Sequence, residues 1–238
     1  MRQRLRELAH CHRRWGCSKL HPILKREGLV VNHKRTERLY RAERLSLRIR
    51  RRRKGAATIR VALPTPQQPN ECWAMDFVSD ALANGRKIRI LTLIDVFSRE
   101  CLALEVDTSL NGLRVTQVLN RVAFSRSLPD VITVDNGPEF ASNIMDAWAY
   151  ERQVKLDFIT PGKPTQNAFI ESFNGKFRDE CLNDNWFMSL SHARDVIEQW
   201  RQTYNTQRPH QALGWLTPEE FVKEQESKLH SELVHTSG

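Results

Sequence analysis

The stretch CWAMDFVSDALANGRKIRILTLIDVFSRECLALEV (residues 72–106) decides the fold of this chain. It holds three runs of strand length, 72–82, 87–97 and 101–106, that are rich in apolar and β-branched residues. The connections between the runs are short, and short connections join antiparallel neighbours. We therefore predict an antiparallel meander of three strands.

The sequence after the meander alternates between helical and strand patterns. Residues 113–126, 139–153 and most of the chain from Thr165 have helical periodicity, whereas 130–134 and 154–159 read as short strands. A final helix is expected at LTPEEF, where Pro218 suits a first helical turn. Strands interleaved with helices predict an α/β core built on a mixed sheet.

The first 46 residues read as helices with a basic surface. Gly28 is suited to end one helix, and Asn32 is suited to cap the next. That next helix would carry Lys34, Arg35 and Arg38, which we expect to contact DNA. Two short helices joined by a tight turn indicate a helix-turn-helix, although many other helical pairs share this pattern.

Positive charge is concentrated at the start of the chain. Residues 1–54 hold 19 Lys/Arg against 4 Asp/Glu, a net +15, while the remainder is at −6. Within this region RIRRRRKGAA (48–57) reads as an extended linker, because like charges at that density repel one another. We expect it to lie along phosphates, with Arg51 and Arg52 in contact. For residues 1–54 as a whole, the charge suggests a nucleic-acid partner, and the alternative is a solvated basic helical region.

Cysteine usage and hydropathy indicate the cellular compartment in which the protein is expected. The five cysteines include no CxxC pair, which fits a reducing compartment better than a disulfide framework. HCHRRWGC (10–17) lacks the spacing of a common zinc finger. No apolar run approaches the about 18 residues of a membrane span, and no signal peptide is visible. We therefore predict a cytoplasmic protein without a membrane partner.

The stretch VDNGPEF (134–140) places Asp135 directly after a short buried strand. Asn-Gly pairs mark hairpin turns, so a plain turn is one interpretation. The sequence continues with Pro138, Glu139 and a helical pattern, which predicts a sharp turn into a helix that begins at Pro138. Because sites collect at the carboxyl ends of strands in α/β sheets, we favour a functional role for Asp135.

Two further acids lie in the predicted meander. Asp76 is flanked by Met75 and Phe77 in the first strand, and a carboxylate there is costly to bury unless it is paired or metal-bound. Asp95, in the second strand, is a rival. It could equally be a strand-end acid that holds Ser98 or Arg99.

A third candidate acid lies in KPTQNAFIESFNGKFRDECLN (163–183). On a helix that starts near Thr165, one apolar stripe forms, and Glu171, Asn174 and Arg178 share the adjacent face. Glu171 could then reach a site at the sheet edge. A solvated glutamate or an i, i+4 pair is the alternative.

Asp76, Asp135 and Glu171 are separated by 58 and 35 residues in the sequence, and with their flanking motifs they resemble a known family. CWAMDFVSDAL, LTLIDVFSRECLALEVD, VDNGPEF, PGKPTQNAFIESFNGKFRDECLN and YNTQRPHQALGWLTPEEF are similar to the OrfB transposases of the IS-three insertion-sequence family. The resemblance runs from about residue 14 to 223. It implies a ribonuclease-H-like fold with a retroviral-integrase type of core, and it carries Asp76, Asp135 and Glu171 over as the catalytic acidic triad.

The resemblance implies an enzyme that cuts and joins DNA with two Mg²⁺ (or Mn²⁺) ions. Such ions prefer oxygen ligands, and together they stabilise the attacking and leaving oxygens of a phosphodiester. We expect Asp76 to bridge both ions, Asp135 to bind one and Glu171 the other. The residues around Glu171 that are expected to hold DNA are Lys163, Gln166, Asn167, Lys176 and Arg178. Solubility alone could explain the two lysines.

The expected domains are a helix-turn-helix segment (1–47), a basic linker (48–63), an integrase core (64–186) and a C-terminal helical extension (187–238). The family usually carries more chain ahead of the segment that Met1 begins, often from an upstream reading frame. The expected partners are therefore DNA (element ends and target), further copies of the chain on that DNA, and an upstream-frame protein. The alternatives are a non-catalytic DNA-binding remnant or subunit, and a ribonuclease-H-type nuclease.

Overall fold

The computed structural model describes residues 1–47, 66–160 and 164–236 of the 238-residue chain. The chain divides into two compact units. Unit 1 comprises Met1–Leu63 with Arg208–Leu216, and unit 2 comprises Pro64–Gln207 with Thr217–Gly238. Each unit is described separately.

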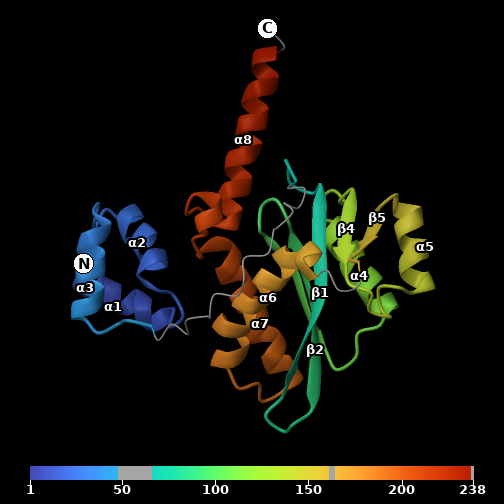
Figure 1. The fold of residues 1–238 in the computed structure, drawn as a ribbon, viewed down its shortest axis with the longest axis horizontal. Helices are drawn as coiled ribbons and strands as arrows, with labels where there is room; N and C mark the ends of the chain where they lie inside the picture. The colour runs from blue at the N-terminus through green and yellow to red at the C-terminus, as the bar shows by residue number, and fades with distance from the viewer. Residues whose placement is uncertain (48–65, 161–163, 237–238) are drawn as a thin grey trace. The chain divides into compact units, whose positions relative to one another are not determined.

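Unit 2 is built on a mixed sheet of five strands (Figure 1). The strands are β1 (Cys72–Ala81), β2 (Lys87–Asp95), β3 (Cys101–Asp107), β4 (Val131–Val134) and β5 (Lys155–Phe158), in the order β3-β2-β1-β4-β5. β1, β2 and β3 pair antiparallel, which confirms the predicted meander, and β4 and β5 add in parallel. The mixed α/β sheet predicted from the sequence is therefore present.

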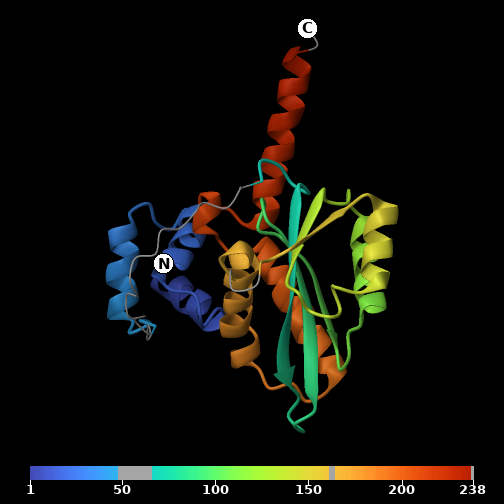
Figure 2. The ribbon, with the colours of Figure 1, turned by 45° about the vertical axis from the view of Figure 1, so that its right-hand side comes forward.

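The two faces of the sheet follow from the alternation of side chains along β1. Trp73 and Met75 pack into one hydrophobic cluster, whereas Ala74 and Val78 pack into another, since successive strand residues point to opposite faces. The first cluster lies beneath α4 (Gly112–Ala123) and α5 (Asn143–Arg152), and the second lies beneath α6 (Ala168–Glu180) and α7 (Leu190–Thr206). Figures 1 and 2 show these helix pairs on opposite sides of the sheet.

The helix α7 covers the free edge of β3 with polar side chains. Asn205 accepts from the Cys101 N–H and donates to the Cys101 carbonyl, both at 2.9 Å. Arg194 donates to the Val106 carbonyl at 3.0 Å, and Arg201 donates to the Cys101 carbonyl at 3.1 Å. Backbone groups that an edge strand exposes are thereby satisfied. Part of the string YNTQRPH (204–210) thus has a structural role at Asn205.

The segment after β4 corrects one expectation. We expected a helix beginning at Pro138 with Glu139 near its positive end, but α5 begins at Asn143, and Pro138–Phe140 form a turn. The side chain of Ser142 caps α5 by accepting from the Met145 N–H at 3.4 Å. The tertiary contact of Glu139, described below, replaces the expected interaction with the helix end.

Unit 1 holds three short helices, α1 (Arg2–Cys11), α2 (Cys17–Arg26) and α3 (His33–Ala42), around a small apolar core. Gly28 follows α2 with φ +69°, and the Leu29 N–H returns to the Leu24 carbonyl at 3.0 Å. This is the glycine-dependent helix end that the sequence predicted. Asn32 caps α3, since its side chain accepts from the Lys34 N–H at 2.9 Å.

The remaining helical segments are short, apart from the last. They are η1 (Pro164–Asn167), η2 (Leu182–Asp184) and η3 (Gln211–Leu213), followed by α8 (Pro218–Thr236) with Pro218 at its first position as predicted. All five cysteines are free thiols. Among the described residues, no helix is both long enough and apolar enough to cross a membrane.

Candidate active site

Asp76 lies in the middle of β1 on the face that α6 covers. The alternation of side chains places it with Ala74 and Val78, and it is half-buried. One carboxylate oxygen accepts from the Phe77 N–H at 2.7 Å. The other accepts from the side-chain amide of Asn174 on α6 at 2.8 Å. Its orientation is therefore set by both the strand and the helix.

Asp135 directly follows β4, which runs parallel to β1. Ala74 lies opposite Thr133, so the same register, continued by two residues, brings Asp135 beside Asp76. The carboxylate of Asp135 accepts from the Gly137 N–H at 2.9 Å. A Cβ atom at Gly137 would lie 2.9 Å from Oδ1 of Asp135, so any other residue there would displace this carboxylate. A side chain at position 137 is therefore incompatible with this position of Asp135.

Glu171 lies on α6, one turn before Asn174, and is exposed. The predicted apolar stripe is buried, with Ile170, Phe173 and Phe177 in the core. The adjacent face runs along β1, because Asn174 bonds to Asp76 and Arg178 donates to the Ser79 carbonyl at 3.1 Å. The helical spacing that the sequence showed thus brings Glu171 to the same strand as Asp76.

The three acids interact electrostatically around Asp76. The pKa of Asp76 is raised from 3.8 to about 6, chiefly by burial and also by the negative charges of Asp135 and Glu171. Hydrogen bonds from Phe77 and Asn174 oppose this rise. Among the described residues, no Lys or Arg forms an ion pair with any of the three acids. In the described part of the chain, the negative charge of this cluster is therefore not compensated by an ion pair.

This donor set fits a hard divalent cation. It consists of carboxylate oxygens, and beside it the Oδ1 atom of Asn174 is buried with no hydrogen-bond partner in the described part of the chain. Within that same part of the chain, no three His, Cys, Asp or Glu side chains form a single metal-binding group. Asp76 instead interacts electrostatically with both Asp135 and Glu171.

Asp95, the rival acid, is fully buried at the end of β2 and lies opposite Trp73 in the register, whereas Asp76 lies opposite Thr92. It accepts three hydrogen bonds: from the Asn70 N–H at 2.7 Å, the Ser98 N–H at 2.7 Å and the Ser98 hydroxyl at 2.9 Å. These contacts match the alternative of a strand-end acid that holds Ser98. Arg99 does not bond to it, since its guanidinium stacks on the Phe169 ring at 3.9 Å.

A cluster that sequence reasoning missed supports the turn after Asp135. Glu139 forms an ion pair with Arg89 of β2, and the Arg89 guanidinium lies 4.2 Å from the centre of the Phe77 ring. Phe77 in turn stacks on Phe140 at 4.9 Å. The cluster ties the 135–140 turn to the two central strands. No local pattern in the sequence pairs Arg89 with Glu139, which lies 50 residues later.

The structure describes four of the five residues expected to bind DNA near Glu171. Lys163 lies outside the described residues. Gln166 accepts from the Thr160 N–H at 2.6 Å, and Lys176 donates to the Ser172 hydroxyl at 3.0 Å. Asn167 is 4% exposed, and its Oδ1 atom has no partner among the described residues. Arg178 is exposed beside β1.

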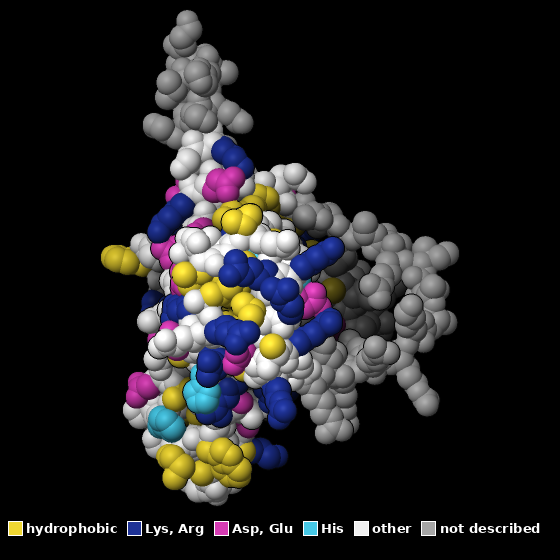
Figure 3. Space-filling model, turned by 90° about the vertical axis from the view of Figure 1, so that its left-hand side faces the viewer, with side chains coloured by type: hydrophobic (Ala, Val, Ile, Leu, Met, Phe, Trp, Pro, Cys, Tyr) yellow, Lys and Arg dark blue, Asp and Glu magenta, His cyan; other side chains and the backbone are white. Residues whose placement is uncertain are grey.

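The basic residues of unit 1 are exposed on α3. Lys34, Arg35 and Arg38 all present their side chains to solvent. In the view of Figure 3, several Lys and Arg side chains lie close together with few carboxylates among them. Arg51 and Arg52 lie outside the described residues.

Comparison with known proteins gives concordant matches along the chain. Family models described as "Integrase core domain" match residues 66–164 and 152–218, and one described as "HTH-like domain" matches residues 1–53. An uncharacterized 31.7 kDa protein of insertion element IS407 from Burkholderia multivorans is 53% identical over 219 residues, which span 92% of this chain and 79% of that protein. The transposase for insertion sequence element IS904 from Lactococcus lactis is 25% identical over 236 residues, which span 93% and 92% of the two chains.

A solved structure has the same fold. The magnesium complex of the HTLV-2 integrase catalytic core domain superposes with a TM-score of 0.54 at 17% identity. The superposition covers 65% of this chain and 97% of that one. At this identity the likeness concerns the fold, which is ribonuclease-H-like.

Proposed function

The chain belongs to the OrfB-type transposases of the IS-three insertion-sequence family, and we propose that it catalyses metal-dependent cleavage of DNA strands and their transfer to a new site. Transposition of insertion sequences is the function of this family. The observation that carries the proposed chemistry is the meeting of Asp76, Asp135 and Glu171 around β1.

The three carboxylates would hold two divalent ions, with Asp76 shared, Asp135 binding one ion and Glu171 the other. The electrostatic interaction of Asp76 with each of the other two acids supports this division. When bound, Mg²⁺ or Mn²⁺ would supply charge stabilisation to the attacking and leaving oxygens of a phosphodiester.

Neighbouring groups position these carboxylates. Asn174 orients one oxygen of Asp76, and the Gly137 N–H orients one oxygen of Asp135. The Arg89–Glu139 ion pair anchors the turn that carries Asp135. Such preorganisation matters because small displacements of reacting groups are costly in rate.

The nucleophile would come from outside the chain: water in cleavage, and a DNA 3′-hydroxyl in strand transfer. No side chain needs to form a covalent intermediate. DNA would be held near Glu171 by Lys163, Gln166, Asn167, Lys176 and Arg178. Along the rest of the DNA, Lys34, Arg35, Arg38, Arg51 and Arg52 would contact phosphates.

The partners we propose are the DNA ends of the element, the target DNA and further copies of this chain on that DNA. A protein from an upstream reading frame is a further proposed partner. We also propose the domain division given above, with a basic linker at 48–63. The bacterial insertion elements among its relatives support a place in the bacterial cytoplasm, on the nucleoid when the protein is bound to DNA.

The test is nicking and joining of DNA that bears the element's ends, with and without Mg²⁺, for wild type and Glu171→Gln. Gln and Glu have similar helix propensities, so the variant should fold and bind DNA while both reactions stop. Glu151→Gln is the matched control, because Glu151 is an exposed glutamate of α5 on the opposite side of the sheet. If Glu171→Gln reacts as wild type does, Glu171 is not a ligand.

The second candidate function is a DNA-binding subunit that lacks independent activity. The concentration of positive charge in residues 1–54 favours it, since that charge supports binding without chemistry. Binding by wild type without any nicking, and recovery of nicking on addition of the upstream-frame protein, would be its signature.

A further inference from the structure

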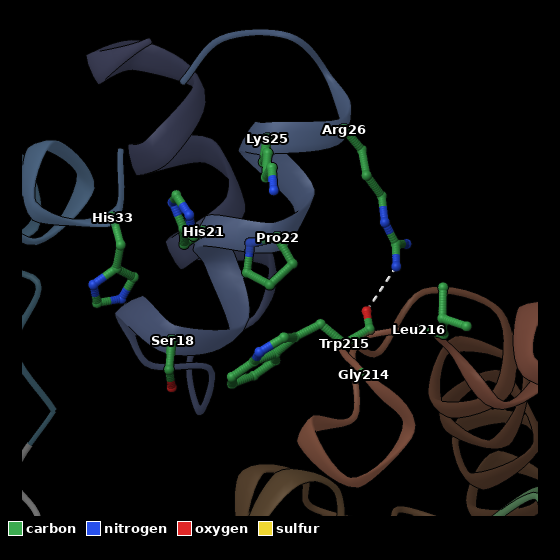
Figure 4. Close-up of a pocket in the computed structure, with 9 residues that line it drawn as sticks. All are labelled: Ser18, His21, Pro22, Lys25, Arg26, His33, Gly214, Trp215 and Leu216. Carbon is green, nitrogen blue, oxygen red and sulfur yellow. Dashed lines mark hydrogen bonds between the residues drawn. The ribbon is translucent and has the colours of Figure 1, made fainter. Parts of the chain in front are cut away.

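Unit 1 contains a cavity of about 640 Å³ whose nine lining residues all belong to that unit (Figure 4). One wall is the α2 side chains of Ser18, His21, Pro22 and Lys25, and the opposite wall is the turn at residues 214–216. The volume falls within the roughly 300–1,000 Å³ of small-molecule sites in proteins. The nine lining residues include neither the acidic triad nor its supporting residues.

The turn at 214–216 presents a tryptophan from a strained backbone. Trp215 has φ +70°, a conformation that bulky residues rarely adopt, and it follows Gly214 with φ +66°. Its N–H donates to the His210 carbonyl at 2.8 Å, and its carbonyl accepts from Arg26 at 2.7 Å. Figure 4 shows the indole extending along the cavity towards Ser18 and Pro22. Strain that the surroundings maintain is concentrated at functional positions.

The ionisable side chains that line the cavity are all basic. None of the nine lining residues is acidic, whereas Lys25, Arg26, His21 and His33 can all carry positive charge. Burial lowers the pKa of His21, and the neighbouring positive charges of His33 and Lys25 lower it further. An occupant with an aromatic body and a negative group would complement both the indole and these cations.

We infer that this cavity takes one unstacked nucleotide of a DNA strand, with the base on the Trp215 indole and its phosphate against Lys25 and His33. His33 is the first residue of α3, so the cavity adjoins the helix whose Lys34 and Arg35 are exposed. A strand that lies along α3 can therefore turn one base into the cavity. Tryptophan faces accept any base, so the contact is expected to be sequence-tolerant. The inference deepens the proposed function, because it names one contact of the DNA-binding unit.

The test uses the full chain and a single-stranded oligonucleotide with one 2-aminopurine, an adenine analogue whose fluorescence falls when it stacks. Wild type should quench it. Trp215→Gly removes the indole and suits a backbone at φ +70°, so the turn at 214–216 should keep its conformation. It should lose the quenching and bind roughly 5- to 100-fold more weakly. Trp215→Phe should recover most of both effects.

Trp186→Ala is the matched control, because Trp186 is 81% exposed in unit 2 and could stack bases without a cavity. Unchanged quenching and affinity in Trp215→Gly, or an equal loss in Trp186→Ala, would overturn the inference. The free 2-aminopurine deoxynucleoside monophosphate should bind far more weakly than the oligonucleotide. Equal affinity would assign the cavity to free nucleotides instead.

The oligonucleotide experiment separates the two proposals. Salt-dependent DNA binding by wild type without quenching overturns this inference and leaves the proposed function standing. Absence of any DNA binding by wild type overturns both.

Discussion

Replacing Asp76 by Asn should stabilise the metal-free protein while it abolishes cleavage and joining. The physical reason is the site's own charge, since Asp76 is half-buried and interacts with the negative charges of Asp135 and Glu171. The amide has a similar size and carries no charge. It therefore removes the cost of desolvating a carboxylate among like charges.

The magnitude follows from the pKa of Asp76, which rises from 3.8 to about 6 on folding. A shift of about two units corresponds to about 3 kcal/mol at pH values above 7. The hydrogen bond to Asn174 need not be lost, because rotating its side-chain amide would turn the unpartnered Oδ1 atom towards the new donor. For a folded unit of this size, about 3 kcal/mol corresponds to a rise in Tm of roughly 6–12 °C.

The gain in stability from Asp76→Asn should become smaller as the pH falls. Asp76 has a raised pKa in the folded state, so the folded state binds more protons than the unfolded state between about pH 4 and 6. The wild-type penalty is complete above that window and is relieved as pH falls through it. The advantage of Asp76→Asn should therefore be greatest near pH 8 and should disappear near pH 4.

The assay is thermal and urea unfolding of wild type and Asp76→Asn in EDTA at pH 8, 6 and 4.5. Adding Mg²⁺ at pH 8 should raise the stability of wild type and leave the variant unchanged, because a ligand stabilises only the state that binds it. Asp157→Asn is the control, since Asp157 is an exposed strand acid of β5. A variant that is no more stable than wild type in EDTA at pH 8 would refute the reasoning.

Three further predictions concern other parts of the molecule. Asp95→Asn should lower the free energy of unfolding by about 1–3 kcal/mol, because it disturbs three buried hydrogen bonds, and strand transfer should fall only modestly. Complete loss of strand transfer in a folded variant would show that Asp95 acts in the chemistry. Arg38→Ala should reduce the slope of log K against log salt for duplex DNA by about 0.9, and an unchanged slope would remove Arg38 from the phosphate contacts. In a double-mutant cycle of unfolding free energies, Arg89→Met and Glu139→Gln should couple by about 1 kcal/mol, and each substitution should slow strand transfer at least tenfold. Additive effects of the two substitutions on the free energy of unfolding would mean that the ion pair does not anchor the turn.

Local patterns in the sequence were sufficient for most of the architecture. The three runs from Cys72 to Val106 form the meander because strand-length apolar runs with short connections have few other ways to pair. Gly28 and Asn32 mark helix ends because their effects act within one turn of backbone. The spacing of Glu171, Asn174 and Arg178 predicted their shared face, since a helix repeats every 3.6 residues.

Only the tertiary structure decided the contacts that join segments distant in the sequence. The helix expected at Pro138 does not form there, because the 135–140 turn is held by Arg89 and Phe77 of the central strands. The same applies to Asn205, whose side chain bonds to Cys101 across 104 residues of chain. It applies equally to the raised pKa of Asp76, which depends on burial and on charges brought in by β4 and α6. These interactions depend on distances in the folded chain, and sequence periodicity carries information only about neighbours along one helix or strand.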